Sequence, residues 1–266
     1  MMDRLNRLTI LIVDDQDEVL KASRDVLQEH LGHEVECALL ASEASRYVRD
    51  RLFDMVIVDA SMFYKGAMMG GLLLAEEFGT VLGTQAILLM SQLDVREKVS
   101  NFNSNFTFLP KPRDVGALTP WVEKELLTKV KSLVKRQYGF VVMPYNNEEC
   151  NEWYQNVLTP WMAEAGYSLR RMDELATTKA INVELLEKIR QAHFVVVGMP
   201  DHNANVYFEA GFATALHKYL IMFAPDLNRV PFDIRANQIL PMTNLENTSA
   251  REKLLRFMSG LRHGKT

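Results

Sequence analysis

The sequence predicts an α/β protein with two doubly wound parallel sheets. Short apolar runs, typical of buried strands, alternate along the chain with stretches whose apolar residues recur at helical spacing. A long helical stretch interrupts this alternation, and a fresh strand begins at Tyr138. The length of 266 residues suits two ordinary domains. We therefore expect two domains, residues 1–136 and 137–266, with the boundary near Arg136.

Five apolar runs in the first half predict the strands of the first sheet. They are Leu8–Val13, Glu34–Leu39, Met55–Val58, Ala86–Met90 and Phe106–Leu109. Between the first two runs, apolar residues from Val19 to Leu31 recur at helical spacing and predict a helix with one buried face. A second helix is expected to open at Thr119 and Pro120, because proline is tolerated at the first helical position.

The second half has the same alternation of strands and helices. Its strand-like runs are Phe140–Met143, Tyr167–Met172, Phe194–Gly198 and Tyr219–Phe223. Its helical stretches are Glu152–Ala165, Val183–Ala192, Asn205–Lys218 and Ser249–Leu261. The halves show no obvious residue-level repeat, so we expect two different domains.

Composition excludes several classes of protein. Hydrophobic residues make up 48% and charged residues 24% of the chain, which is typical of a folded core and excludes disorder. A net charge of −4 argues against DNA binding, because nucleic acid is held by concentrated basic surface. Cys37 and Cys150 lack metal-ligand spacing and are expected to be free thiols. The amino terminus is too polar for a signal peptide, and no apolar run approaches the roughly 20 residues of a membrane span, so we expect a soluble, cytoplasmic protein.

Three carboxylates follow predicted strands of the first half. Asp14 and Asp15 come directly after Ile10–Val13, and Asp59 comes directly after Met55–Val58. Open α/β sheets place their ligands at the carboxyl ends of such strands. Converging carboxylates repel one another without a cation, and hard oxygen ligands of this kind suit Mg²⁺.

Two further polar residues follow the next strands. Ser91 ends the fourth run, and Lys111 follows the fifth. A hydroxyl and an ammonium group beside Mg²⁺ can stabilise an acyl phosphate formed on a carboxylate. Each acidic residue alone could instead be a polar turn or helix cap. Five groups in this order favour the site.

Residues from about Leu8 to Val134 resemble the receiver domain of response regulators, which has a flavodoxin-like fold. The match covers the acidic pair, the strand-ending Asp59, the hydroxyl and the Lys-Pro dipeptide at Lys111. The resemblance implies that Asp59 accepts a phosphoryl group from a sensor histidine kinase. It also implies that Asp14, Asp15 and Asp59 hold Mg²⁺ together with the backbone carbonyl of Ser61.

The same resemblance assigns the remaining residues of the switch. Ser91 becomes the switch hydroxyl, Lys111 the phosphate partner and Phe108 the rotating aromatic residue. Two features depart from the family. The loop from Ala60 to Gly71 is longer than usual and lacks the usual proline, and residues 103–105 read Asn-Ser-Asn in place of Gly-Ala. Phosphorylation should survive both changes, while the surface that reads it differs.

The second half contains a glutamate in apolar company. Glu209 lies in a predicted helix between Tyr207, Phe208, Ala210 and Phe212, and Asn205 is expected to cap that helix. A carboxylate in such surroundings must find a partner or change its pKa. Two interpretations stay open: an ion pair with an arginine (Arg170, Arg171 or Arg235), or a catalytic or ribose-binding carboxylate.

The stretch Asn203–Ala213 is similar to the Asn-Pro-Asn-Val-Phe-Tyr-Glu-Leu-Gly motif of bacterial TIR-like domains, which are related to nucleoside 2-deoxyribosyltransferases. Phe140–Tyr145 and Pro231–Arg235 also match that group. The resemblance covers about residues 138–261 and implies a flavodoxin-like domain. It implies that Glu209 acts on an N-glycosidic bond of NAD or a nucleotide by matching positive charge that develops at the sugar.

The candidate ligand-binding or catalytic residues of this half are Glu209, Asn205, Asp201, Tyr145 and Arg235. Gly198 stands where that family has an Asp, and Asp201 is the carboxylate that can replace it. Ala204 and Ala210 also depart from the motif. These departures favour a binding module, whereas the retained Glu209 favours an enzyme.

The leading hypothesis is therefore a response regulator, phosphorylated on Asp59 in a Mg²⁺-dependent reaction and expected to form homodimers. Its output would be a TIR-like domain that binds a nucleotide or a protein partner. The alternative is a phosphorylation-regulated N-glycoside hydrolase that acts on NAD or a nucleotide through Glu209.

Overall fold

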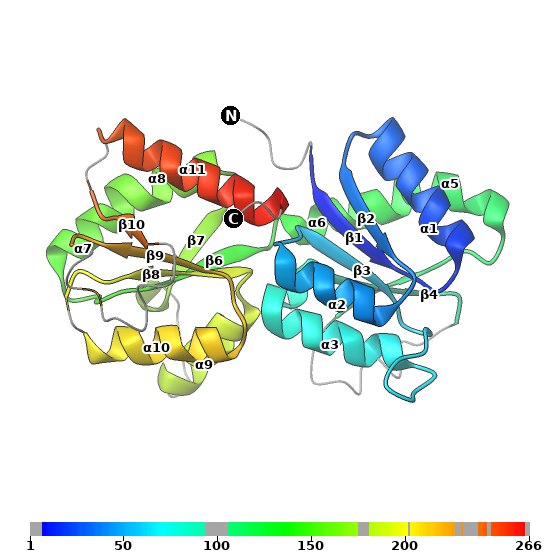
Figure 1. The fold of residues 1–266 in the computed structure, drawn as a ribbon, viewed down its shortest axis with the longest axis horizontal. Coiled ribbons are helices and arrows are strands. Elements are labelled where there is room, and N and C mark those ends of the chain that lie inside the picture. Colours follow the sequence, from blue (N-terminus) through cyan, green and yellow to red (C-terminus); the bar gives the residue numbers. More distant parts are fainter. Residues whose placement is uncertain are drawn as a thin grey trace. The chain divides into compact units, whose positions relative to one another are not determined.

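The computed structural model describes residues 7–93, 106–174, 181–201, 203–226, 230, 239–243 and 246–263. These residues form two compact units, one of residues 7–137 with 261–263 and the other of residues 138–260. Each unit contains a five-stranded parallel sheet with helices on both faces (Figure 1). The predicted fold class is confirmed. None of the described helices combines the length and apolar content needed to cross a membrane.

The first sheet has the strand order β2-β1-β3-β4-β5. Its strands are β1 (Thr9–Val13), β2 (Glu34–Ala38), β3 (Met55–Asp59), β4 (Ile87–Ser91) and β5 (Thr107–Pro110). Every residue of β1, β3 and β4 is buried, because helices cover both faces of the sheet. This explains why these strands are continuous apolar runs, while edge strand β2 alternates with polar residues.

The helices of the first unit lie in two layers. Figure 1 shows α2 (Ala41–Asp50) and α3 (Gly70–Leu82) on one face of the sheet, and α1 (Asp17–Arg24) and α5 (Leu118–Trp121) on the other. A π-helical segment, Asp25–His30, continues α1, and another, Val122–Leu126, joins α5 to α6 (Leu127–Val134). Val19, Val26, Val122 and Val130 of these helices belong to the same core cluster as Ile10 and Ile57 of the sheet.

The second sheet repeats this topology in the order β10-β9-β8-β6-β7. Its strands are β6 (Tyr138–Val142), β7 (Ser168–Arg171), β8 (Phe194–Gly198), β9 (Leu220–Ala224) and β10 (Ile239–Pro241). In Figure 1, α9 (Ile181–Gln191) and α10 (Ala204–Ala215) cover one face, while α7 (Glu148–Trp153), α8 (Thr159–Glu164) and α11 (Thr248–His263) cover the other. The segment Tyr154–Leu158 joins α7 to α8 as a π-helical turn.

The structure refines several sequence expectations. The helix expected at Thr119 begins one residue earlier, at Leu118, and Pro120 lies in its first turn, where its missing N–H group is not needed. Strand β10 was not predicted, because its three residues are too short to show a pattern. The unusual Asn-Ser-Asn at 103–105 lies outside the described residues.

Gly71 connects the first sheet to α3 at very close range. A Cβ atom at this position would lie 1.9 Å from the carbonyl oxygen of Asp59 and 2.8 Å from its carbonyl carbon. The junction that carries Asp59 therefore requires a residue without a side chain.

We expect Gly71→Ala to lower the free energy of unfolding of the first unit by about 2 to 3 kcal/mol, because backbone must move to admit the methyl group. Urea unfolding measures this change. Gly211→Ala is the matched control: its Cβ meets nothing within 4 Å in α10, so it should stabilise by about 0.5 to 1 kcal/mol. Equal stability of Gly71→Ala and wild type would contradict the close approach.

Candidate functional site

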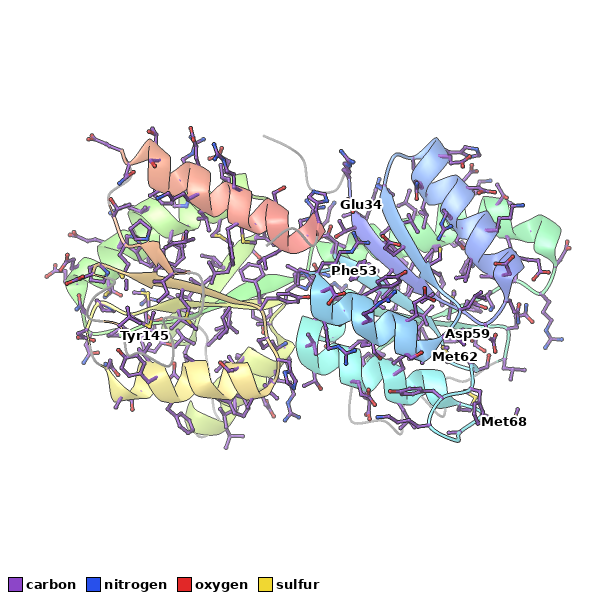
Figure 2. The ribbon with its side chains drawn as sticks, in the orientation of Figure 1. Glu34, Phe53, Asp59, Met62, Met68 and Tyr145 are labelled. Atoms are coloured by element: carbon purple, nitrogen blue, oxygen red, sulfur yellow. The ribbon has the colours of Figure 1, made fainter. Side chains whose placement is uncertain are left out.

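The two sheets place their polar residues at equivalent points. In each sheet the first strand along the chain, β1 or β6, lies next to the edge strand that follows it, β2 or β7. The third strand, β3 or β8, lies on the other side of the first. The direction in which strands are added therefore reverses between β1 and β3 and between β6 and β8. Ligands of open α/β sheets bind at this reversal, beyond the carboxyl ends of the strands. Figure 2 shows Asp59 at this end of the first unit and Tyr145 in the second.

The first site is built around Lys111. Its ammonium group lies 2.6 Å from Oδ2 of Asp14 and 2.9 Å from Oδ2 of Asp59, and the side chains of Lys111 and Asp14 are fully buried. The strands bring these residues together: Asp14 follows β1, Asp59 ends β3 and Lys111 follows β5. The other oxygen of Asp14 accepts a hydrogen bond of 2.9 Å from the backbone N–H of Gln16.

This cluster contains more carboxylates than ammonium groups. Burial raises the pKa of Asp14 to about 6, and the nearby charge of Asp59 adds to that rise, although Lys111 opposes it. Burial alone lowers the pKa of Lys111, but Asp14 and Asp59 outweigh it and hold the ammonium group protonated. One ammonium group thus forms ion pairs with two buried carboxylates, and the exposed carboxylate of Asp15 lies beside them.

The donor set fits a divalent cation. Oxygen atoms of Asp14, Asp15 and Asp59 all lie within 4.8 Å of one another. Carboxylate oxygens are the ligands that Mg²⁺ prefers, and the missing positive charge is what such an ion supplies. Asp15 is exposed, so one side of the cluster is open to solvent.

Two hydroxyl groups lie next to Asp59. Both the backbone N–H and the hydroxyl of Ser61 donate to Oδ1 of Asp59, at 2.9 Å and 2.7 Å. The hydroxyl of Ser91, which is fully buried, donates to the hydroxyl of Ser61 at 3.3 Å. The sequence singled out Ser61 for its backbone carbonyl alone; its side-chain contact is visible only in the structure. Phe108 is half-buried on β5 and pairs in register with Leu89.

The long loop after Asp59 contains a closed two-residue turn. Tyr64 and Ala67 exchange backbone hydrogen bonds of 3.1 Å and 2.9 Å, and Lys65 and Gly66 have φ angles of 48° and 79°. Such paired positive φ angles define the tight turn favoured in hairpins. Figure 2 shows buried Met62 beside Asp59 and Met68, which is 80% exposed, farther along the loop. The extra residues therefore extend the surface next to the first site.

Comparisons with known proteins bear on about half of the chain. No protein-family model matches the sequence, and no curated protein matches it significantly. The solved structures to which the chain is similar include response regulators. The response regulator TrrA from Thermotoga maritima, in complex with Mg²⁺ and BeF, is 26% identical; the match covers 47% of this chain and 98% of that one, with a TM-score of 0.37.

Two further structures give the same picture. A response regulator from Chloroflexus aurantiacus J-10-fl is 28% identical over 49% of this chain and 99% of its own, with a TM-score of 0.38. A CheY-like receiver domain protein from Methanospirillum hungatei JF-1 is 23% identical over 47% of this chain and 98% of its own, with a TM-score of 0.36. Each match therefore covers nearly all of the other chain and about half of this one.

In the second unit, the charge of Glu209 acts on Tyr145. Tyr145 follows β6 and Glu209 lies on α10, and both are partly buried. Burial raises the pKa of Glu209 to about 7. Burial also raises the pKa of Tyr145, and the charge of Glu209 adds to that rise. Each side chain is therefore partly desolvated, and their elements adjoin β6 and β8, where the strand order reverses.

Arg170 and Arg171, two of the arginines that could pair with Glu209, make other contacts. Arg171 forms an ion pair with Asp173 and donates to Oδ1 of Asn151 at 2.8 Å. Its guanidinium also lies over the rings of Tyr145 and Tyr154, at 5.3 Å and 4.7 Å. Arg170 lies over the ring of Tyr138 at 4.5 Å. Within the described residues, neither forms an ion pair with Glu209, and Arg235 lies outside them.

The expected helix cap was wrong by two residues. Asn203, not Asn205, caps α10: its backbone is extended, and its side-chain oxygen accepts from the N–H groups of Asn205 and Val206. Asn205 lies inside the first turn, where its helical backbone excludes the capping geometry. Its side chain is exposed.

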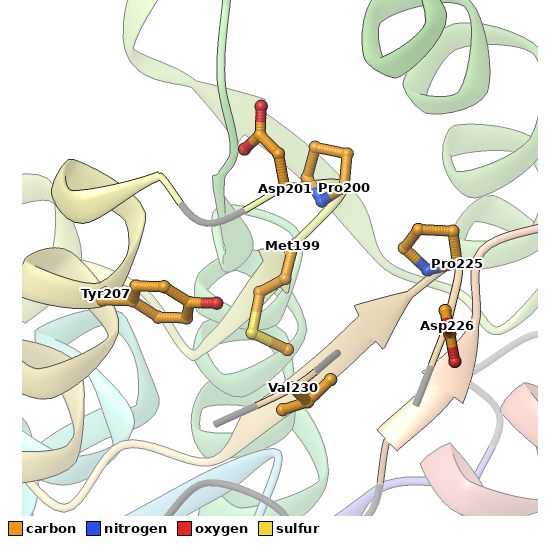
Figure 3. Close-up of a pocket in the computed structure, with 7 residues that line it drawn as sticks. All are labelled: Met199, Pro200, Asp201, Tyr207, Pro225, Asp226 and Val230. Carbon is orange, nitrogen blue, oxygen red and sulfur yellow. The ribbon is translucent and has the colours of Figure 1, made fainter. Parts of the chain in front are cut away.

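Asp201 is exposed and belongs to the wall of a small hollow after β8. Figure 3 shows Tyr207 pointing toward Met199 in a small hollow, with the exposed carboxylate of Asp201 turned away from both. The cavity volume there is about 10 Å³, room for about one water molecule.

Glu209 should make stability depend on pH. Its pKa is about 7 in the folded protein against an ordinary 4.5, so the folded state retains a proton that the unfolded state has released. The stabilisation by this proton is complete below the unfolded pKa and is lost as the pH rises through 7.

We expect Glu209→Gln to become more stable than wild type as the pH rises from about 5 to 8, by an amount on the order of 1 kcal/mol after solvent screening of this partly exposed group. Urea unfolding at several pH values measures the difference. Glu148→Gln, at an exposed position of α7, is the control and should show no such trend. A difference independent of pH would contradict the assigned environment of Glu209.

Proposed function

We propose that the chain is a two-component response regulator in which Asp59 accepts a phosphoryl group from a sensor histidine kinase. The observation that carries this proposal is the ammonium group of Lys111 placed between the buried carboxylates of Asp14 and Asp59. An ion pair alone would serve stability poorly, because desolvating the charges costs much of what their attraction returns. Asp15 and Ser91 at neighbouring strand ends complete a set suited to phosphoryl transfer.

The proposed reaction uses Asp59 as nucleophile. One carboxylate oxygen of Asp59 forms a bond to phosphorus, while the bond from phosphorus to the kinase histidine breaks and the imidazole leaves with that electron pair and takes up a proton. Asp14, Asp15, Asp59 and the backbone carbonyl of Ser61 would hold Mg²⁺, which supplies positive charge to the phosphoryl oxygens. Lys111 is already within reach of Asp59 and neutralises part of the added charge.

Phosphorylation would rearrange the hydroxyl groups beside Asp59. Ser61 now donates to Asp59, and Ser91 donates to Ser61. A phosphoryl group on Asp59 offers new acceptor oxygens, so Ser91 and Lys111 would turn toward it. Movement at these strand ends, with Phe108 on β5 following, biases the first unit between two packed arrangements. Homodimerisation through this unit is part of the proposal.

The second unit is proposed to be the output. We infer a TIR-like domain that binds a nucleotide or a protein partner, on the strength of the Asn203–Ala213 motif and the fold that carries it. Helix α6 leads along the chain directly into β6, so a change in the first unit has a short covalent route to the second.

A second candidate function is cleavage of an N-glycosidic bond in NAD or a nucleotide. The observation that favours it is the partly buried carboxylate of Glu209 on the helix that follows β8, close to where ligands of such sheets bind. Ionised Glu209 would stabilise positive charge developing on the ribose as the base departs. Gly198, which holds no carboxylate, favours binding without turnover.

Asp59→Asn should abolish labelling by radiolabelled acetyl phosphate in the presence of MgCl₂, because the nucleophilic oxygen is lost. Asp50→Asn, exposed at the end of α2, should be labelled like wild type. Phosphoryl incorporation is followed by gel autoradiography and located by mass spectrometry. Stable label on the first unit of Asp59→Asn would refute Asp59 as the acceptor.

Base release tests the alternative. If the second unit is an enzyme, wild type should release nicotinamide from NAD, or a base from a nucleotide panel, and Glu209→Gln should reduce the rate by at least about 100-fold. Glu252→Gln on α11 serves as the control. Chromatography of the products, with and without acetyl phosphate, gives the rates. No turnover together with phosphate-dependent dimerisation would assign the output to binding and assembly.

A further inference from the structure

A large cavity lies in the second unit on the side of the sheet covered by α7. Its volume is about 540 Å³, within the range of small-molecule sites. We call it the α7 cavity; its walls include Glu149, Glu152, Trp153, Asn156, Met242 and Thr243. These residues come from α7, the turn that follows it and the carboxyl end of β10. The small hollow of Figure 3 lies on the α10 side and shares Pro200 and Pro225 with it.

The wall of the α7 cavity next to the sheet is apolar. Trp153 is 7% exposed and packs edge-to-face on Phe223 of β9, with ring centroids 5.0 Å apart. Val157 lies one turn farther along the helix, so both side chains lie on the face turned to the sheet. Together with Pro200 and Pro225 they offer a rigid surface that fits a ring or a branched hydrocarbon.

The helix also supplies an acidic rim. Glu149 and Glu152 are three residues apart, which places both carboxylates on one side of α7, and both are exposed. Asn156 continues this row, and Thr243 faces it from the end of β10. Among the described residues that line the α7 cavity, none is basic.

The potential in the cavity is negative. Burial raises the pKa of the Cys150 thiol to about 11, and the charges of Asp201 and Glu149 raise it further than Arg171 lowers it. Cys150 lines the cavity and is 1% exposed, so this field reaches the apolar part as well as the rim. A ligand that carries phosphate groups would be repelled here.

We propose that the α7 cavity binds a small organic cation: a compact apolar body that carries an ammonium group. The body packs on Trp153 and Val157, and the ammonium group lies between the carboxylates of Glu149 and Glu152, whose mutual repulsion it relieves. Asn156 and Thr243 offer oxygen acceptors to the remaining ammonium hydrogens. This site is separate from Asp59 and from the pair of Tyr145 and Glu209, so it goes beyond the proposed function and does not depend on it.

A pair of nearly isosteric probes tests the charge preference. The full-length protein is titrated with 2-phenylethylamine and with 3-phenylpropionate, and binding is followed by ligand-observed NMR. The amine should bind at least about tenfold more tightly than the carboxylate. Glu149→Gln and Glu152→Gln should each weaken amine binding by about twofold to fivefold, the range of an exposed ion pair. Glu148→Gln, on the same helix but outside the cavity wall, should bind like wild type.

A filling variant tests the place of binding. Asn156→Trp adds bulk at an exposed wall position and should abolish amine binding, while circular dichroism and labelling of Asp59 by acetyl phosphate stay unchanged. The proposal is overturned if the carboxylate probe binds as well as the amine, if amine binding survives Asn156→Trp, or if the amine does not bind at millimolar concentration. Since Asp59 labelling is scored in the same samples, failure here is distinct from failure of the proposed phosphotransfer.

Discussion

The first unit is organised around the contact between Lys111 and the buried carboxylates of Asp14 and Asp59. The contact forms only when the carboxyl ends of β1, β3 and β5 lie at the same edge of the sheet. It therefore depends on the strand order and register of this sheet. Breaking the contact by removing one partner would leave an uncompensated charge in a buried place, which costs several kcal/mol. The cluster still holds three carboxylates against one ammonium group, a donor set that suits a divalent cation.

The two units use one topology for different chemistry. In both, the order of strands reverses beside the first strand, and polar residues gather beyond the carboxyl ends. The first unit places charged groups there and pairs them through Lys111. The second unit places Glu209 and Tyr145 there, and burial is the largest influence on the pKa of each. The fold supplies the position, and the side chains decide the chemistry.

Much of this arrangement can be predicted from the sequence. Continuous apolar runs located β1, β3, β4 and β8, because strands buried on both faces tolerate few polar residues. Residues at the carboxyl ends of parallel strands meet at one edge of the sheet, which brought Asp14, Asp59 and Lys111 together at the ends of β1, β3 and β5. The sequence did not predict strand β10 or the helix cap at Asn203. Each involves only a few residues, and their conformation depends on the elements that they contact in the folded protein.

The amino-acid sequence alone determined the fold class and the set of charged groups at the first site, because buried parallel strands impose a period and an order that a chain displays directly. The tertiary structure decided how the polar groups pair. It joined Ser61 to Asp59 through a side chain, engaged Arg171 with Asp173 rather than Glu209, and opened the α7 cavity beneath an acidic rim. These outcomes depend on loop paths and side-chain directions, which local sequence patterns do not encode.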